Sequence, residues 1–232
     1  SLINSGSIYY ELGQFQTALN YMQEGLLLHQ QSNVSLWSGL TLLMNKGVIE
    51  WQLGRYQNAL KELEEAKRTA AGTELMTVRA EINIYLSHIW YELKEYAKGQ
   101  EAYQAAHRTV SQLENVYLQY NLIRLESALR LAHGADLSLV ADLDGHIRQM
   151  AEKGSLLYKA RLLHLQASIL IRLDALDQAY ELLQRCLSSF EEMGMVRHQA
   201  EVQLSLGYIF KQKKNLPAAL SAWQTVVGLS TQ

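Results

Sequence analysis

The chain has 232 residues, a formal net charge of -2 and 48% hydrophobic residues, a balance typical of a folded protein and not of a disordered one. The near-neutral charge argues against a nucleic-acid-binding domain, which normally presents a basic face. The single cysteine, Cys186, excludes an internal disulfide and a cysteine-rich zinc site.

Long helices are expected along the whole chain, because its one proline, Pro217, leaves the rest free of helix breakers. After a first hairpin within residues 1–33, the pattern predicts helices over residues 35–53, 56–71, 75–93, 96–111, 114–132, 136–152, 155–173, 177–192, 196–213 and 216–229. No apolar run reaches the length of a membrane span. We therefore expect an all-α chain without β-strands.

An internal repeat organises these helices. The segment YYELGQFQTALNYMQEGL at residues 9–26 recurs at residues 49–66, 89–106, 170–187 and 209–226. Its turn residue is Gly13, Gly54, Lys94, Asp174 and Lys214 in turn, at steps of 41, 40, 80 and 40 residues. The double step predicts a further turn residue at position 134, which is Gly134. Six repeats then fill the chain, at about 1–33, 34–73, 74–113, 114–153, 154–193 and 194–232, and the fourth is degenerate.

Two sets of equivalent positions indicate how each hairpin packs. Two places after the turn residue stands a bulky side chain, with Asp136 as the exception: Phe15, Tyr56, Tyr96, Leu176 and Leu216. Five places after it stands a small residue, with Leu139 as the exception: Ala18, Ala59, Gly99, Ala179 and Ala219. The small residue lets two antiparallel helices approach closely. Each hairpin still exposes an apolar stripe, which its neighbour must cover.

Together with small residues seven places before the turn (Gly6, Gly47, Ser87, Ser127, Ala167 and Gly207), this pattern resembles the tetratricopeptide repeat over essentially the whole chain. The resemblance implies an all-α superhelix, or solenoid, of six such hairpins forming a single domain over residues 1–232. The usual period is about 34 residues, so these repeats are long. Long repeats are similar to those in sensor domains of large ATP-dependent LuxR-type bacterial transcription activators, and in peptide-pheromone receptors.

No catalytic constellation is found. Glycines occur singly, without a phosphate-binding loop. No histidine lies four residues from another, so the two-histidine zinc helix is absent: His29, His88, His107, His133, His146, His164 and His198. We expect no enzymatic activity, no metal and no cofactor.

The binding surface is expected on the first helix of each hairpin, which lines the concave face in a superhelix of this type. The candidate groove has an aromatic and apolar part and a basic part: Tyr10, Met44, Trp51, His88 and Tyr91, then Arg124, Arg161 and His164, which would meet an acidic group. The alternative is that curvature brings these side chains against adjacent repeats, where they fill the interior. The clamp that grips a C-terminal carboxylate needs Lys and Asn where Ile3, Ser7, Met44 and Val48 stand, so that function is disfavoured.

The expected function is binding of a protein, a peptide or a small-molecule effector. Because the chain begins without Met, we interpret it as a piece of a larger multidomain regulator in the cytoplasm, such as a bacterial transcriptional regulator. No direct contact with nucleic acid or membrane is expected. The alternative function is that of a structural scaffold that assembles a multiprotein complex.

Overall fold

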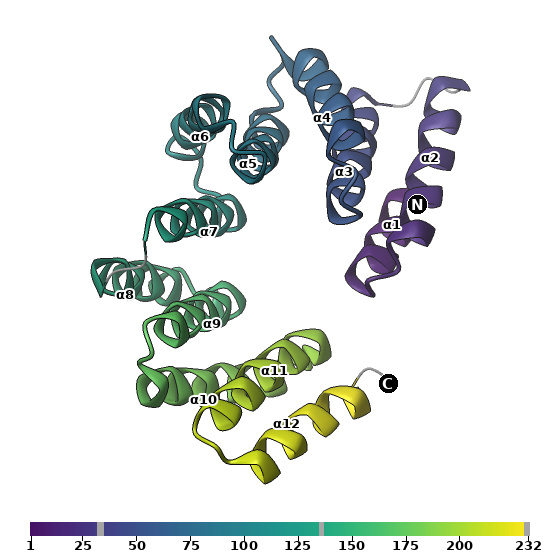
Figure 1. The fold of residues 1–232 in the computed structure, drawn as a ribbon. Coiled ribbons are helices and arrows are strands. Elements are labelled where there is room, and N and C mark those ends of the chain that lie inside the picture. Colours follow the sequence, from purple (N-terminus) through teal and green to yellow (C-terminus); the bar gives the residue numbers. More distant parts are fainter. Residues whose placement is uncertain (32–34, 135–136, 230–232) are drawn as a thin grey trace. The chain divides into compact units, whose positions relative to one another are not determined.

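The computed structural model describes residues 1–31, 35–134 and 137–229, which form twelve α-helices and no strand (Figure 1). The helices are α1 (Leu2–Glu11), α2 (Phe15–Gln31), α3 (Leu36–Gln52), α4 (Tyr56–Ala70), α5 (Met76–Glu92), α6 (Tyr96–Val110), α7 (Val116–His133), α8 (Leu137–Glu152), α9 (Leu156–Arg172), α10 (Leu176–Glu192), α11 (Val196–Gln212) and α12 (Leu216–Leu229). The predicted all-α class is confirmed, and no predicted helix boundary differs by more than two residues. Asp136 and the junction at residues 33–34 lie outside the described residues.

The helices pack into two compact units, residues 1–125 and 126–232, with the boundary inside α7. We describe each unit by itself. That the whole chain acts as a single domain stays a prediction. Among the described helices, none is long and apolar enough to cross a membrane.

The hairpin turns depend on a left-handed backbone at the repeat's turn residue. All six such residues have a positive φ, including three that are not glycine: Gly13, Gly54, Lys94, Gly134, Asp174 and Lys214. At the second turn Gly54 N donates to the Trp51 carbonyl at 2.8 Å and Arg55 N to the Glu50 carbonyl at 2.9 Å. These two bonds satisfy carbonyls that the end of α3 leaves open.

Close approach of paired helices explains the small residues of the repeat. The alanines five places after the turn residue are fully buried: Ala18, Ala59, Ala179 and Ala219. On the facing helix, a Cβ added to Gly47 would lie 2.8 Å from Leu63 Cγ and 3.2 Å from the Ala59 carbonyl oxygen. A larger side chain at either position would push the two helices apart.

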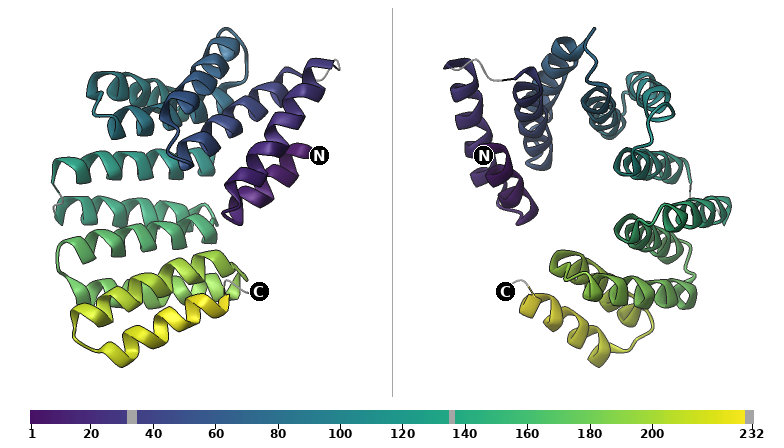
Figure 2. Two further views of the ribbon diagram at one scale, coloured as in Figure 1. Left: turned by 45° about the vertical axis from the view of Figure 1, so that its right-hand side comes forward. Right: turned by 180° about the vertical axis from the view of Figure 1, so that it is seen from behind.

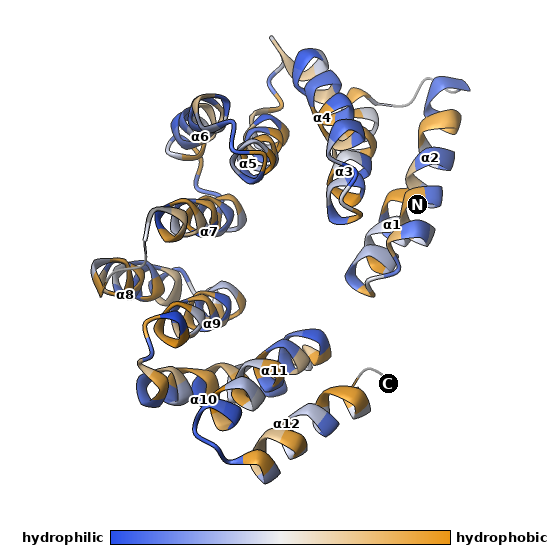
Figure 3. Ribbon diagram, in the orientation of Figure 1, coloured by the Kyte–Doolittle hydropathy of each residue, from blue (hydrophilic) through white to orange (hydrophobic). Residues whose placement is uncertain are grey.

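The core of unit 1 includes a cluster around α1 to α3 and another around α3 to α6. Leu19, Met22 and Ile49 lie in the first, and Leu63, Ile82 and Leu86 in the second. Every helix in Figure 3 carries both hydrophilic and hydrophobic residues, as expected for amphipathic helices packed on one another.

In unit 2 the helices from α8 to α12 follow one another in chain order, as the left view of Figure 2 shows. The degenerate fourth hairpin is held by Arg130 of α7, whose guanidinium donates to Asp142 Oδ2 at 2.6 Å and Ser138 Oγ at 2.8 Å, both on α8. Gln166 of α9 then donates to the Val140 carbonyl at 3.0 Å. Polar contacts therefore support the hairpin where the small-residue pattern fails.

Candidate functional site

A cavity of about 610 Å³ lies in unit 2, with first helices of two successive hairpins contributing its walls. Its lining comes from α9, the turn after it, the first residue of α10, and α11: Ser168, Ile171, Arg172, Asp174, Leu176, Leu204, Ser205, Tyr208 and Gln212. Two large lining side chains, Leu204 and Tyr208, are 50% and 45% exposed. The volume falls in the range of about 300–1,000 Å³ that is typical of ligand sites.

A hydrogen bond between α9 and α11 and another within α9 order the wall of this cavity. His164 Nε2 lies 3.2 Å from Ser205 Oγ, and Ser168 Oγ donates to the His164 carbonyl at 2.9 Å. Burial lowers the pKa of His164, while the Glu201 carboxylate opposes the shift. The pair holds Ser168 and Ser205 in place as small polar groups among apolar neighbours.

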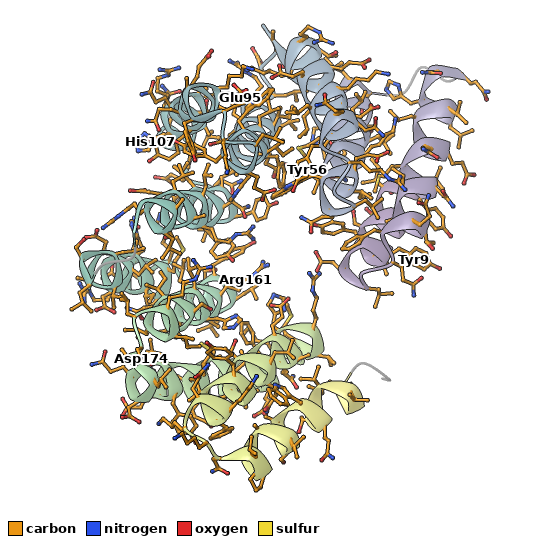
Figure 4. The ribbon with its side chains drawn as sticks, viewed as in Figure 1. Tyr9, Tyr56, Glu95, His107, Arg161 and Asp174 are labelled. Carbon is orange, nitrogen blue, oxygen red and sulfur yellow. The ribbon has the colours of Figure 1, made fainter. Side chains whose placement is uncertain are left out.

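Charges of both signs stand at the rim. Arg172 and Asp174 are exposed lining residues, one at the end of α9 and the other in the turn that follows. Figure 4 labels Asp174 at this turn and Arg161 on α9. Arg161 is part of the predicted groove but not of the cavity lining, and it lies one helical turn before His164. The cavity thus offers an apolar floor with polar groups at its edge.

In unit 1 the aromatic part of the predicted groove centres on Trp51. The Trp51 ring stacks on His88 at a centroid distance of 5.6 Å and meets Tyr85 edge-on at 6.3 Å. Its indole Nε1 donates to Glu92 Oε2 at 2.8 Å. All three partners belong to α5, so Trp51 joins α3 to the first helix of the next hairpin. The alternative that these side chains contact adjacent repeats is therefore correct for Trp51 and His88.

His88 is neutral in this setting. Burial lowers its pKa to about 3, and the nearby Arg124 guanidinium acts in the same direction. The structure thus brings three predicted residues, Trp51, His88 and Arg124, into one neighbourhood. Arg124 is partly exposed there, beside the aromatic cluster.

A second, smaller cavity of about 200 Å³ lies in unit 1 and includes the predicted Tyr10. Its lining comes from α1, α2, α3, α5 and α7: Ser7, Tyr10, Glu11, Met22, Asn45, Val48, Ile49, Tyr85 and Tyr117. The hydroxyls of Tyr85 and Tyr117 lie 3.5 Å apart. Burial, with help from Tyr117 and Glu81, raises the pKa of Tyr85 well above its ordinary value.

Two predicted groove residues lie elsewhere. Met44 is 5% exposed and belongs to the core cluster, so it is not part of a surface. Tyr91 covers Gly99 of its own hairpin and donates from its hydroxyl to Gln100 Oε1 at 2.8 Å. Gly99 leaves room for the Tyr91 ring, which is why this ring turns toward α6.

Sequence reasoning missed Asn45, Tyr85 and Ser205, which occupy equivalent positions nine places before the turn residue and all line cavities. The predicted groove instead included Met44, which lies four residues before Val48 on α3. The residue three places before Val48 or His88 lies on the same helical face and is partly exposed in repeats two and three, as Asn45 and Tyr85. The sequence did indicate these positions, because each holds a polar or aromatic residue next to an apolar one, namely Met44, Ile84 or Leu204.

No arrangement of reactive groups stands out in the described ranges. No group of three or more His, Cys, Asp or Glu side chains there is placed to hold a metal ion. Cys186 is buried, and burial raises the pKa of its thiol to about 12. A thiol with so high a pKa is a poor nucleophile at neutral pH.

Comparison with known proteins agrees with this geometry. Residues 3–73 match the tetratricopeptide repeat family model. No curated protein sequence matches the chain.

The fold resembles several solved structures. One is a Signal Transduction ATPase with Numerous Domains (STAND) protein with a tetratricopeptide repeat sensor, from Pyrococcus horikoshii, at 13% identity and a TM-score of 0.66. The alignment covers 93% of this chain but only 31% of the STAND protein. Apo RapI aligns at 12% identity and a TM-score of 0.67, over 98% of this chain and 81% of RapI.

A third structure is the Rap conjugation gene regulator of the plasmid pLS20 in complex with the Phr* peptide. It aligns at 14% identity and a TM-score of 0.66, over 98% of this chain and 60% of that protein. These likenesses show that the chain has a tetratricopeptide-type fold.

Proposed function

We propose that this chain binds a peptide segment of a partner protein in the cavity between α9 and α11. The observation that carries the proposal is the pair Leu204 and Tyr208, half-exposed at a cavity of about 610 Å³. Exposed apolar and aromatic side chains at a hollow are typical anchors of an interface, since a partner side chain can bury them.

The polar lining suits an extended peptide. Ser168, Ser205 and Gln212 offer hydroxyl and amide groups that can bond to a peptide backbone. Arg172 and Asp174 at the rim can each pair with an opposite charge on the partner. Apolar anchors therefore provide affinity and the rim provides orientation.

The aromatic surface of unit 1 is a second proposed contact. Trp51 and His88 are engaged with each other, yet both remain partly exposed beside Arg124 and the Tyr10 cavity. Arg161 and His164 remain proposed contacts of unit 2, where Arg161 would meet an acidic group and His164 would act through Ser205. The chain catalyses no reaction in this account.

We further propose that the domain senses its ligand on behalf of a larger regulator, with transcription as one output. Two similar folds support this: one is the sensor of a STAND protein, and the other belongs to a Rap conjugation gene regulator bound to the Phr* peptide. A small-molecule effector in the same cavity would serve the same role.

A displayed random-peptide library selected on the intact chain tests the proposal. We expect enriched sequences that share an apolar residue, and we expect enrichment to disappear on the Leu204→Ser variant. Leu156→Ser is the matched control, because Leu156 is also an exposed leucine, lies on α9 and is outside the cavity lining. Equal enrichment on both variants would refute the cavity as the site.

A further inference from the structure

The small cavity of unit 1 has an unusual lining for a basic groove. Three tyrosines from three helices surround it, namely Tyr10, Tyr85 and Tyr117, and Glu11 supplies a carboxylate. None of its lining residues is Lys, Arg or His. The lining of this cavity therefore favours a positively charged group, whereas Arg124 and Arg161 were expected to meet an acidic one.

We propose that this cavity binds a cationic group, an alkylammonium or guanidinium carried by the ligand of unit 1. Tyrosine ring faces attract cations through their quadrupole, and a carboxylate adds a charge-assisted hydrogen bond. The proposal names the chemistry of the second contact surface and rests on the proposed function only for the existence of that surface.

The volume favours one side-chain head group. About 200 Å³ is below the range of about 300–1,000 Å³ typical of sites that enclose a whole small ligand. The floor is apolar, formed by Met22, Val48 and Ile49, and suits the methylene stem of Lys or Arg. The Ser7 hydroxyl and the Asn45 side-chain amide can accept hydrogen bonds from the head group.

A second carboxyl, outside the cavity lining, acts on Tyr85. Glu81 precedes Tyr85 by one turn of α5 and contributes to raising the pKa of Tyr85, after burial and the contacts with Tyr117. Burial also raises the pKa of Glu81 itself. A bound cation would be attracted by the Glu11 carboxylate of the lining, whereas an anion would be repelled by it.

Calorimetric titration of the intact chain with N-acetyl-L-arginine amide tests this inference. We expect saturable binding at least about tenfold tighter than that of N-acetyl-L-citrulline amide, its neutral isostere. Glu11→Gln should weaken the arginine derivative by about tenfold, because it removes the charge and keeps the shape. Glu11 is exposed, so the variant should fold.

The matched control is Glu65→Gln, an exposed carboxyl on α4 outside the cavity, which should leave binding unchanged. A titration with agmatine distinguishes a free small cation from a peptide side chain as the source of the cationic group. Binding as tight as that of the capped arginine would indicate a free small cation, and weaker binding would indicate a peptide side chain. Equal binding of the citrulline derivative, no saturable binding, or preference for N-acetyl-L-glutamate amide would each overturn the inference. Peptide selection at Leu204 could still succeed in that case.

Discussion

The indole of Trp51 on α3 is bonded to the carboxylate of Glu92 on α5, with 2.8 Å between Nε1 and Oε2. This bond links two successive hairpins, and the bonded residues are 41 positions apart in sequence. Trp51 also packs against the core cluster that contains Leu63 and Ile82. Trp51 therefore takes part in packing between adjacent repeats, which the sequence analysis gave as the alternative to an open groove.

Trp51→Ala should therefore destabilise unit 1. Loss of the ring contacts with Tyr85 and His88 and of the bond to Glu92 should lower the free energy of unfolding by about 2–4 kcal/mol. Urea denaturation monitored by circular dichroism measures this change. Trp37→Ala is the control, since Trp37 lies on the same helix at 51% exposure and should cost no more than about 0.5 kcal/mol. Equal effects of the two substitutions would contradict the packing role.

Much of the fold was predictable because each hairpin repeats the same local chemistry. Turn residues need a left-handed backbone and facing helices need a small residue, so Gly54 and Ala59 mark structure directly. The spacing of 40 residues also located Gly134, although its repeat matches poorly. These requirements act within one hairpin and are therefore visible in its sequence.

The candidate site was less predictable because it depends on contacts between hairpins. Whether Met44 or Asn45 is exposed depends on how the next first helix packs against α3, and helical spacing permits both. Tyr91 was misplaced because the space above Gly99 is visible only when α5 and α6 are paired. The cavity of unit 2 likewise needs small side chains on both α9 and α11, at Ser168 and Ser205.

Two glycines inside helices should respond in opposite directions to alanine. Gly47→Ala should destabilise by about 1–3 kcal/mol, because its Cβ would meet Leu63 and the backbone of Ala59. Gly145→Ala should stabilise by about 0.5–1 kcal/mol, because nothing lies within 4 Å of its Cβ and alanine favours the helix. Thermal melting of both variants measures these changes. A shift of the melting temperature in the same direction in both variants would refute the close approach at Gly47.

A left-handed backbone at a turn residue other than glycine should lower the free energy of unfolding relative to glycine at the same position. Lys94 has φ 62°, so Lys94→Gly should raise the free energy of unfolding by about 0.5–1 kcal/mol. Lys61→Gly, at an exposed position inside α4, should lower it by about 1 kcal/mol. Chemical denaturation of the two variants compares them directly, and a loss of stability in Lys94→Gly would speak against strain at this turn.

Glu81 should make stability depend on pH. Burial raises its pKa from 4.5 to about 7, so the folded chain keeps a proton that the unfolded chain has lost between these values. The contribution of the neutral carboxyl is complete below about pH 4.5 and is lost as pH rises through 7.

Glu81→Gln removes this loss. The free energy of unfolding of the variant should equal that of the wild type at pH 4.5 and exceed it by about 1–3 kcal/mol at pH 8. Urea denaturation at the two pH values measures the difference, with Glu101→Gln as an exposed control on α6. If the free energy of unfolding of the variant differs from that of the wild type by the same amount at pH 4.5 and pH 8, Glu81 is not buried as described.

The dissociation constant of a library-selected peptide, measured by fluorescence anisotropy, tests the central claim most directly. It should rise by about thirtyfold in Tyr208→Ala, because loss of an interface anchor costs about 2 kcal/mol. It should stay within about twofold of wild type in Leu156→Ala, whose leucine is 63% exposed and lies outside the cavity lining. Unchanged affinity in Tyr208→Ala, with peptide binding intact, would contradict binding between α9 and α11.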